Sequence, residues 1–199
     1  MKILLASDNP GKIKEIKELY NNYEVIPLKE MEEILGRKLE VTEEQDTFEK
    51  NALEKCSCLY NLVKEYDENI MCIADDSGIA IDGLNGFPGL HTARWMDADD
   101  HTKNIELLKR MEGKDNRGCH YTTAIAIVSK NINEVCSYTL SGTLTTECVG
   151  ENGFGFDEIF LLENNLTLAQ ITAEEKYLIS PRTKALEMIR KIIDNSVIK

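Results

Sequence analysis

The sequence predicts an α/β fold: a mixed sheet with an antiparallel β-rich extension and flanking helices, forming two lobes around a central cleft. Short apolar runs alternate with segments of helical periodicity in the first part of the chain, which is typical of alternating strands and helices. Several β-branched runs then follow one another in the middle, which favours antiparallel pairing over a doubly wound sheet. The length of 199 residues suits one domain with two lobes, spanning residues 1–199.

Hydrophobic spacing and capping residues predict the elements of the first third of the chain. Ile13, Ile16 and Leu19 recur at helical spacing, and Asn9 followed by Pro10 is a typical helix start. The expected elements are a strand over Lys2–Ala6, a helix over Pro10–Tyr20, a strand over Glu24–Leu28, an ambiguous charged segment over residues 29–40, and a helix over Thr47–Lys64.

Turn-forming residues divide the middle of the chain. The DDSG segment at residues 75–78 predicts a turn between two short strands, and SKNIN at residues 129–133 predicts a hairpin turn. The expected elements are strands over Ile70–Ala74 and Ile79–Ile81, a loop over Asn85–Gly89, a helix over Thr102–Met111, and a hairpin of Tyr121–Val128 with Glu134–Leu140, which Gly142–Val149 would extend.

The C-terminal part is expected to end in two helices. A strand over Glu158–Leu162 precedes them, and Thr172 with Glu175 forms the capping box of a short helix. Ser180 and Pro181 then begin the last helix. Its expected inward-facing residues are Ala185, Leu186, Ile189, Ile192 and Ile193.

The composition argues against several classes of protein. The net charge of −12 disfavours binding to nucleic acid, although a local cation cluster or a metal ion still permits binding of a small polyphosphate. No segment is long and apolar enough to cross a bilayer, and the apolar run after Lys2 is too short for a signal peptide. We therefore expect a cytoplasmic protein with no nucleic-acid partner and no membrane partner.

The cysteines and histidines suggest no metal site. The six cysteines lack the paired spacing of zinc ligands, so we expect free, mostly buried thiols in a reducing compartment. The three histidines are scattered along the chain. His101, in the DADDH segment, is better explained by a helix start than by a ligand role.

The segment SDNPGK, residues 7–12, lies where a predicted strand meets a helix N-terminus. Such a junction exposes backbone N–H groups with a positive dipole, to which anions bind. Gly11 lets the backbone approach closely, Lys12 adds positive charge, and Ser7 and Asn9 offer hydrogen bonds. The same residues also fit a capped helix with a surface lysine, so this segment alone leaves phosphate binding open.

Adjacent carboxylates follow a predicted buried strand at Asp75 and Asp76. If the strand ends there, both can share one site, and a cation such as Mg²⁺ would relieve their repulsion. A β-turn without a metal is the alternative. Glu43 and Glu44 precede the long predicted helix and are weaker candidates, because acids there are commonly solvated caps.

The segment GENGFGFDEIF, residues 150–160, interleaves glycines with two phenylalanines. A ring presented between glycines can stack on a flat base, although Phe156 is expected to fold back into the core. Asp157 could accept a hydrogen bond from a ring N–H. Lys176, Arg182 and Lys184 supply positive charge around the start of the last helix. The alternative is that these three residues are ordinary surface charges.

These segments, in this order, resemble the inosine/xanthosine triphosphate pyrophosphatase family over nearly the whole chain. Five blocks together are far more specific than any one of them. The blocks are SDNPGK (7–12), EEQDTFEKNA (43–52), ADDSG with GFPG and ARW (74–95), GENGFGFDEIF (150–160) and EEKYLISPRTKAL (174–186).

The resemblance implies a role for each block. The first would hold the triphosphate, the acids would hold Mg²⁺, and the glycine–aromatic block would pack on the base. By its distance from Thr47, Glu43 is the better match for one metal ligand and Glu44 the second choice. The implied site comprises Asp76 as catalytic proton acceptor; Glu43, Asp76 and Asp75 at the metal; and Ser7, Asn9, Lys12, Ser77, Phe154, Gly155, Phe156, Asp157, Lys176 and Arg182 at the substrate.

The resemblance implies a single nucleotide pyrophosphatase domain, acting as a homodimer. It would convert ITP, dITP or XTP to the monophosphate and pyrophosphate with Mg²⁺ as cofactor. The chain departs from the family pattern GFGYDP at Phe156 and Glu158, and from Ser-His-Arg at Pro181. Because Pro181 cannot donate a side-chain hydrogen bond, base preference is less firmly implied than the reaction. Alternatives are a pyrophosphatase for other modified nucleotides and an inactive nucleotide-binding protein.

Overall fold

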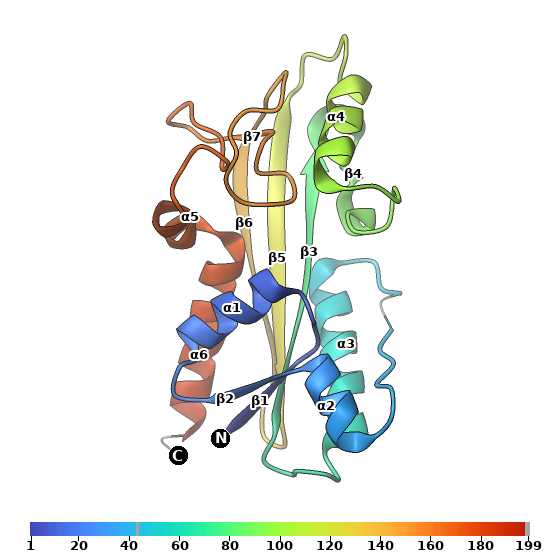
Figure 1. Ribbon diagram of the computed structural model, residues 1–199, viewed down its shortest axis with the longest axis vertical. Coiled ribbons are helices and arrows are strands. Elements are labelled where there is room, and N and C mark those ends of the chain that lie inside the picture. Colours follow the sequence, from blue (N-terminus) through green and yellow to red (C-terminus); the bar gives the residue numbers. More distant parts are fainter. Residues whose placement is uncertain (43, 198–199) are drawn as a thin grey trace. The chain divides into compact units, whose positions relative to one another are not determined.

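The chain forms two compact units in the computed structural model, which describes residues 1–42 and 44–197 (Figure 1). The first unit comprises Met1–Asp76, Thr123–Tyr138 and Arg182–Lys199. The second unit comprises Ser77–Thr122 and Thr139–Pro181. Each unit has its own hydrophobic core.

Parallel strands form the centre of the first unit. β1 (Lys2–Leu5) pairs in parallel with β2 (Glu24–Pro27) on one side and with β3 (Met71–Ile81) on the other. Ile3 is in register with Val25 in β2 and with Met71 in β3. Covered parallel strands are buried on both faces, which explains their continuous apolar runs.

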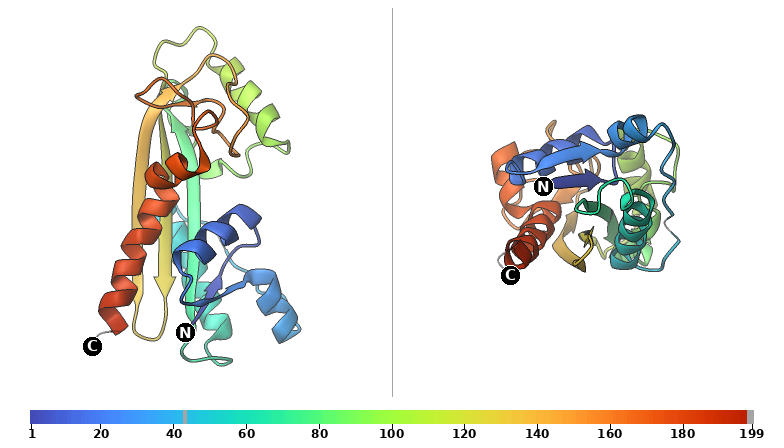
Figure 2. Two further views of the ribbon diagram at one scale, coloured as in Figure 1. Left: turned by 60° about the vertical axis from the view of Figure 1, so that its left-hand side comes forward. Right: turned by 90° about the horizontal axis from the view of Figure 1, so that it is seen from below.

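Helices cover both faces of these strands (Figures 1 and 2). Alternate strand residues such as Ile3 and Ile73 pack with α1 and α6 on one face, whereas Leu4 and Cys72 pack with α2 and α3 on the other. The helices are α1 (Pro10–Leu19), α2 (Leu28–Leu35), α3 (Phe48–Val63) and α6 (Pro181–Val197). The expected inward residues of α6 are confirmed, since Ala185, Leu186, Ile189 and Ile193 are buried and Ile192 packs against them.

The predicted hairpin in the middle of the chain is confirmed. β5 (Gly118–Val128) and β6 (Asn133–Leu144) are neighbours in the sheet, and Ser129 N donates to Ile132 O at 2.8 Å in the turn. Both strands are longer than their apolar runs indicated. Along each strand, one portion belongs to the first unit and the remainder to the second.

The second unit carries the antiparallel pairing expected of a β-rich extension. β4 (Phe87–Pro88) pairs with β3, and β7 (Phe160–Leu161) pairs with β6, both antiparallel. The full strand order is β2-β1-β3-β5-β6-β7, with β4 beside β3. Two helices, α4 (Asp100–Arg110) and α5 (Ala173–Ile179), and two 3₁₀ turns, Asp82–Leu84 and Gly89–His91, complete the unit.

The predicted turn at residues 75–78 is wrong. DDSG lies inside one continuous strand, β3, rather than between two short strands. Asp and Gly tolerate turns, but cations compensate the Asp75 charge here and the strand continues. The ambiguous segment contains α2, which ends at Gly36 in the left-handed conformation with φ of 64°.

Two strands are shorter than the sequence predicts. The predicted extension over Gly142–Val149 reaches only Leu144, and the strand expected over Glu158–Leu162 shortens to β7.

Within the residues that the structure describes, no helix has the length and apolar character needed to span a membrane.

Candidate active site

The loop after β1 leads directly into a capped helix, as the sequence predicts. Asn9 Oδ1 accepts a hydrogen bond from Lys12 N at 3.1 Å, and Ser7 Oγ accepts one from Asn9 N at 3.2 Å. Asp8 Oδ1 accepts from Lys29 N at 2.8 Å, which ties this loop to α2. These bonds fix an exposed helix N-terminus at the carboxyl end of a buried strand, where backbone N–H groups favour an anion.

A buried cluster of charges lies behind this loop. Lys12 Nζ is 2.7 Å from Asp75 Oδ2, and Arg182 Nε is 3.6 Å from the same oxygen. Arg182 NH1 also lies 3.1 Å from Glu15 Oε2. Asp75 and Arg182 are 2% and 4% exposed, so little solvent screens these charges.

The third cation of the cluster is Lys55 on α3. Its Nζ donates to the Asp75 backbone oxygen at 2.9 Å. Burial alone would raise the pKa of Asp75, but Lys12 and Arg182 outweigh it and lower this pKa to about 2. Burial lowers the pKa of Lys55, and the Asp75 charge opposes that shift. Asp75 is therefore the counter-ion that allows three cations to gather at one strand.

Asp76 points away from this cluster. Successive side chains on a strand face opposite sides, so Asp75 faces α1 and α6 whereas Asp76 faces α3. Asn51 Nδ2 donates to Asp76 Oδ2 at 2.9 Å, and Asn51 Oδ1 accepts from Gln45 N at 2.8 Å. One amide thus links Asp76 to the acidic segment before α3.

The acidic segment is only partly described. Glu43 lies outside the described residues. Glu44 is exposed, and its backbone N donates to Glu54 Oε2 at 3.2 Å. The neighbouring Gln45 is bonded to Asn51, and Asn51 in turn is bonded to Asp76.

Asn51 and Lys55 are site residues that the sequence analysis missed. Both lie on the buried face of α3 with Ala52, Cys56 and Leu59. A polar side chain on an otherwise apolar helix face was the available signal, because burial of an amide or an ammonium group requires a partner. Here the partners are the two adjacent carboxyl residues of β3.

In the second unit, an aromatic ring and a lysine lie together. Lys176 Nζ is 4.2 Å from the centre of the Phe154 ring and contacts the buried Asp157 carboxylate. Asp157 Oδ2 also accepts from Phe154 N at 2.8 Å. Phe154 is 43% exposed whereas Phe156 is 8% exposed, so one ring is presented and the other is buried, as expected.

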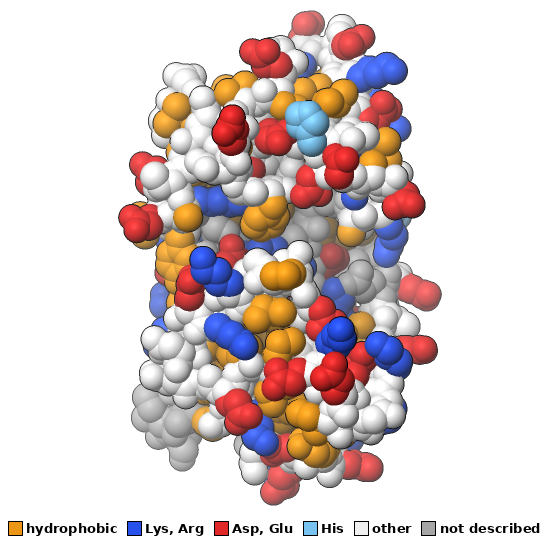
Figure 3. Space-filling model, in the orientation of Figure 1, with side chains coloured by type: hydrophobic (Ala, Val, Ile, Leu, Met, Phe, Trp, Pro, Cys, Tyr) orange, Lys and Arg blue, Asp and Glu red, His pale blue; other side chains and the backbone are white. Residues whose placement is uncertain are grey.

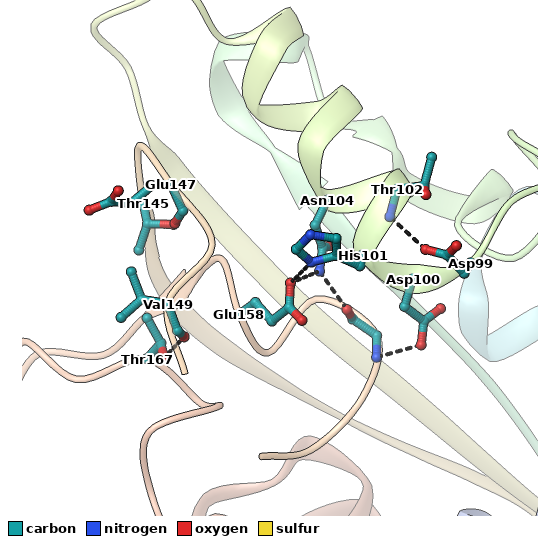
Figure 4. A network of polar contacts seen from close by, with 11 residues as sticks. Asp99, Asp100, His101, Thr102, Asn104, Thr145, Glu147, Val149, Glu158 and Thr167 are labelled. Atoms are coloured by element: carbon teal, nitrogen blue, oxygen red, sulfur yellow. Dashed lines mark hydrogen bonds and ion pairs between the residues drawn. The ribbon is translucent and has the colours of Figure 1, made fainter. Parts of the chain in front are cut away.

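The glycine loop around Phe154 is held by α4 (Figure 4). Gly155 N donates to Asp100 Oδ2 at 2.8 Å, and Asn104 Nδ2 donates to Gly155 O at 2.9 Å. Gly153 has φ of 81°, and a Cβ at this position would overlap the Asp157 carboxylate. These contacts fix the loop. The Asp157 carboxylate contacts Lys176 and also accepts a hydrogen bond from the backbone N of Phe154.

The predicted site residues fall into two groups. In the second unit, Ser77 follows Asp76 in β3 and is half-buried. Arg182 pairs with Asp75 in the first unit, and its contact with the base, which the resemblance implies, stays a prediction. The described first-unit group is Ser7, Asn9, Lys12, Asp75, Asp76 and Arg182; the second-unit group is Ser77, Phe154, Gly155, Phe156, Asp157 and Lys176.

On the face shown in Figure 3, side chains of both charges are present. Figure 3 shows acidic side chains distributed over the displayed face, with Lys and Arg side chains among them. A net charge of −12 is therefore compatible with local cation clusters such as that around Asp75.

Comparison with known protein families gives one consistent result. The model of the Ham1 family matches residues 3–192 of the chain. A dITP/XTP pyrophosphatase of Sulfurimonas denitrificans is 37% identical over 97% of this chain and 98% of its own length. A dITP/XTP pyrophosphatase of Clostridium tetani is 36% identical over 95% of this chain and 94% of its own length.

Solved structures agree with this result. The structure of the Staphylococcus aureus Ham1 protein matches with a TM-score of 0.85 and 30% identity, covering 98% of this chain and 100% of that chain. A structure from Mycobacterium abscessus, described as a nucleoside-triphosphatase / dITP/XTP pyrophosphatase, matches with a TM-score of 0.74 and 33% identity. That match covers 95% of this chain and 98% of the other.

Proposed function

This chain belongs to the Ham1 family, and we propose that it hydrolyses non-standard purine nucleoside triphosphates. Its substrates are ITP, dITP and XTP, and its products are the nucleoside monophosphate and pyrophosphate. The observation that carries the proposal is the pair of adjacent aspartates in β3. The Asp75 carboxylate pairs with Lys12 and Arg182, its backbone oxygen accepts from Lys55, and Asp76 is linked through Asn51 to the acidic segment before α3.

We assign binding of the triphosphate to the first unit. The capped loop Ser7–Asn9 and the α1 N-terminus offer backbone N–H groups, and Lys12 supplies positive charge. Because Asp75 already compensates Lys12 and Arg182, these cations are held in place before the nucleotide arrives. Such preorganised positive charge stabilises the charge that develops on the phosphates during cleavage.

The donor groups near Asp76 fit a magnesium ion. Mg²⁺ prefers oxygen ligands, and the carboxylates of Asp76, Glu43 and Glu44 are of this type. We assign Asp76 and Glu43 as ligands. Asp75 Oδ2 is committed to Lys12 and Arg182, so its assigned role is electrostatic support. When bound, Mg²⁺ supplies neutralisation of the triphosphate charge.

Asp76 is the proposed proton acceptor. A water molecule attacks the α-phosphorus in line with the bond to the leaving group, and Asp76 takes its proton. Asn51, which donates to Asp76 Oδ2, orients the carboxylate for this role. Pyrophosphate then leaves, and its negative charge is stabilised by the Lys12 side of the site.

We assign recognition of the base to the second unit. The exposed Phe154 ring offers a stacking surface, and Lys176 beside it offers a donor. Hypoxanthine and xanthine carry a 6-keto acceptor where adenine carries an amino donor. A site built to donate to that oxygen leaves its donors unpaired against adenine, which can lower the reaction rate by orders of magnitude.

We also propose a cytoplasmic location and a homodimer. The six free cysteines are compatible with a reducing compartment, and nucleoside triphosphates are present there. The homodimer is carried over from the family resemblance. Sedimentation analysis of the purified chain tests it, with a species of twice the chain mass expected.

A substrate panel tests the proposed reaction. Pyrophosphate release is measured with and without Mg²⁺ for ITP, dITP, XTP, GTP and ATP, and for a panel of modified pyrimidine and methylated nucleotides. We expect Mg²⁺-dependent release from the first three and much slower release from ATP. Equal rates on ATP, or faster release from another modified nucleotide, would contradict the proposed base preference; ITP binding without release would contradict the reaction.

Two variants and one control variant test individual residues in the same assay. Asp76→Asn should reduce kcat on ITP by at least about 10²- to 10⁴-fold, because it removes the proposed proton acceptor and also weakens a proposed Mg²⁺ ligand, whereas the contacts proposed for the base are unchanged. Asp46→Asn is its matched control, since the Asp46 carboxylate forms an exposed ion pair with Lys50 at 2.7 Å. Pro181→His restores the family residue and should increase the ratio of ITP to ATP turnover if that imidazole contributes to base recognition.

A further inference from the structure

Three metal-ligating side chains from separate segments converge in the second unit. His101 lies on α4, Cys148 lies after β6, and Glu158 follows the glycine loop. A ring nitrogen, the thiol sulfur and a carboxylate oxygen all lie within 4.8 Å of one another. His101 Nδ1 is 2.8 Å from Glu158 Oε2 (Figure 4). No sequence motif predicts this group, because its three residues are far apart in the chain.

We propose that His101, Cys148 and Glu158 form a binding site for a zinc-class divalent cation, distinct from the proposed magnesium ligands. Zn²⁺ is bound in proteins by imidazole nitrogen, thiolate sulfur and carboxylate oxygen, usually with four ligands in tetrahedral geometry. Ligands around such an ion lie roughly 3–4 Å from one another, given metal–ligand distances of about 2.0–2.3 Å. The three donors lie within 4.8 Å of one another, so a small inward adjustment of their side chains would bring them to these distances around one ion.

A second observation, an unsatisfied buried side chain next to this group, supports a bound ion at this position. Asn104 is fully buried, and its Oδ1 has no hydrogen-bond partner within residues 1–42 and 44–197. The amide nitrogen of the same side chain donates to Gly155 O and lies 3.4 Å from Glu158 Oε2. An unsatisfied buried carbonyl is costly, so the side chain that borders this group carries a polar atom that the described residues leave unsatisfied.

The donor set discriminates against magnesium. Mg²⁺ prefers six oxygen ligands, whereas a set of one nitrogen, one sulfur and one oxygen suits zinc or cobalt. The family pattern noted above has proline where this chain has Glu158, so the carboxylate of this group is a departure from that pattern. The site is therefore not explained by the ligands assigned to the pyrophosphatase reaction.

An ion at this position would connect three segments. The first two turns of α4 already hold Gly155 through Asp100 and Asn104. His101, in the first of these turns, would be joined through the metal to Cys148 and Glu158. Metal binding should therefore raise the thermal unfolding temperature of the whole chain, because a ligand that binds only the folded state stabilises it.

The competing explanation is a hydrogen-bonded triad without metal. In that arrangement Glu158 accepts from His101, Cys148 and Asn104, and no ion is needed. The two explanations differ in one measurable property. A metal site yields a thiolate–metal bond, whereas a triad yields none.

Cobalt spectroscopy and zinc competition test the proposal on the full chain, in excess Mg²⁺ after treatment with a chelator. We expect one Co²⁺ per chain, a near-ultraviolet thiolate-to-cobalt absorption, and visible bands typical of tetrahedral cobalt. Addition of Zn²⁺ should remove these bands. Cys148→Ser should abolish the thiolate absorption, and His101→Ala should weaken zinc affinity by about 10- to 100-fold.

Matched controls separate this site from other thiols and histidines. Cys136→Ser and His120→Ala should leave both the spectrum and the zinc affinity unchanged, because neither residue belongs to the group. Circular dichroism confirms that each variant is folded, and Glu158→Gln provides a near-isosteric second test. Absence of stoichiometric cobalt binding in the wild type, or an unchanged spectrum in Cys148→Ser, would overturn the proposal. Neither result depends on pyrophosphatase activity.

Discussion

Asp75→Asn should destabilise the protein strongly, because it removes the charge that three cations share. The substitution keeps the shape of the side chain but leaves Lys12 and Arg182 without their common buried counter-ion. Lowering a carboxyl pKa from 3.8 to about 2 corresponds to about 2 kcal/mol of stability at neutral pH. Breaking a buried ion pair costs about 3–5 kcal/mol, so we expect a loss of about 2–5 kcal/mol.

Urea unfolding followed by circular dichroism measures this loss at pH 7. Asp46→Asn is the control, because Asp46 forms an exposed pair with Lys50 and its removal should change the unfolding free energy very little. If Asp75→Asn unfolds at the wild-type urea concentration, the buried carboxylate does not compensate the cations and the electrostatic reasoning is wrong.

The same pair of proteins has a pH signature of defined sign. The folded-state pKa of Asp75 lies below its ordinary value, so its stabilisation is present above about pH 4 and is lost as pH falls through about 2. The gap in unfolding free energy between wild type and Asp75→Asn should therefore be constant from pH 8 to about pH 5 and narrow toward pH 3. A gap that widens on acidification would contradict this assignment.

Three further substitutions test separate parts of the account. Tyr20→Phe removes a 2.8 Å hydrogen bond from the buried phenol to Leu186 O and should cost about 1 kcal/mol in urea unfolding; no loss would show that water replaces this bond. Ile189→Ala creates a cavity at a fully buried position of α6 and should cost about 2–5 kcal/mol in the same assay, so a loss well below this range would contradict tight packing there. Lys176→Met removes the cation that contacts Asp157 and should raise KM for ITP about tenfold, about 1.4 kcal/mol, and an unchanged KM would exclude Lys176 from substrate recognition.

Much of the fold is predictable from local patterns. The cap at Asn9, the inward face of α6 and the capping box of α5 follow from short-range spacing, and the structure confirms all three. Such features depend on residues close together in the chain, where periodicity and hydrogen-bond chemistry act directly.

The strand through Asp75 shows where local reasoning fails. DDSG has the composition of a turn, yet the chain remains extended because Lys12 and Arg182, distant in sequence, compensate the buried charge. The opposite directions of Asp75 and Asp76 follow from that continuity. A single sequence contains no sign of these tertiary partners, so the continuation of the strand through residues 75–78 could not be predicted from it.

The kinds of residue at the candidate site were predictable from the sequence, but their contacts were not. The buried Phe156 was expected, but the role of Asn51 in linking Gln45 to Asp76 was not. The convergence of His101 with Cys148 and Glu158 is also invisible to spacing rules. Those rules detect ligands that lie on one helix or in one loop, and these three come from separate segments.

The most direct test of the central claim is hydrolysis of ITP in ¹⁸O-labelled water with Mg²⁺, followed by mass spectrometry of the products. Attack on the α-phosphorus with Asp76 as proton acceptor predicts one ¹⁸O atom in IMP, unlabelled pyrophosphate, and almost no turnover by Asp76→Asn. Label in pyrophosphate, formation of inosine diphosphate with phosphate, or full activity of Asp76→Asn would contradict the account.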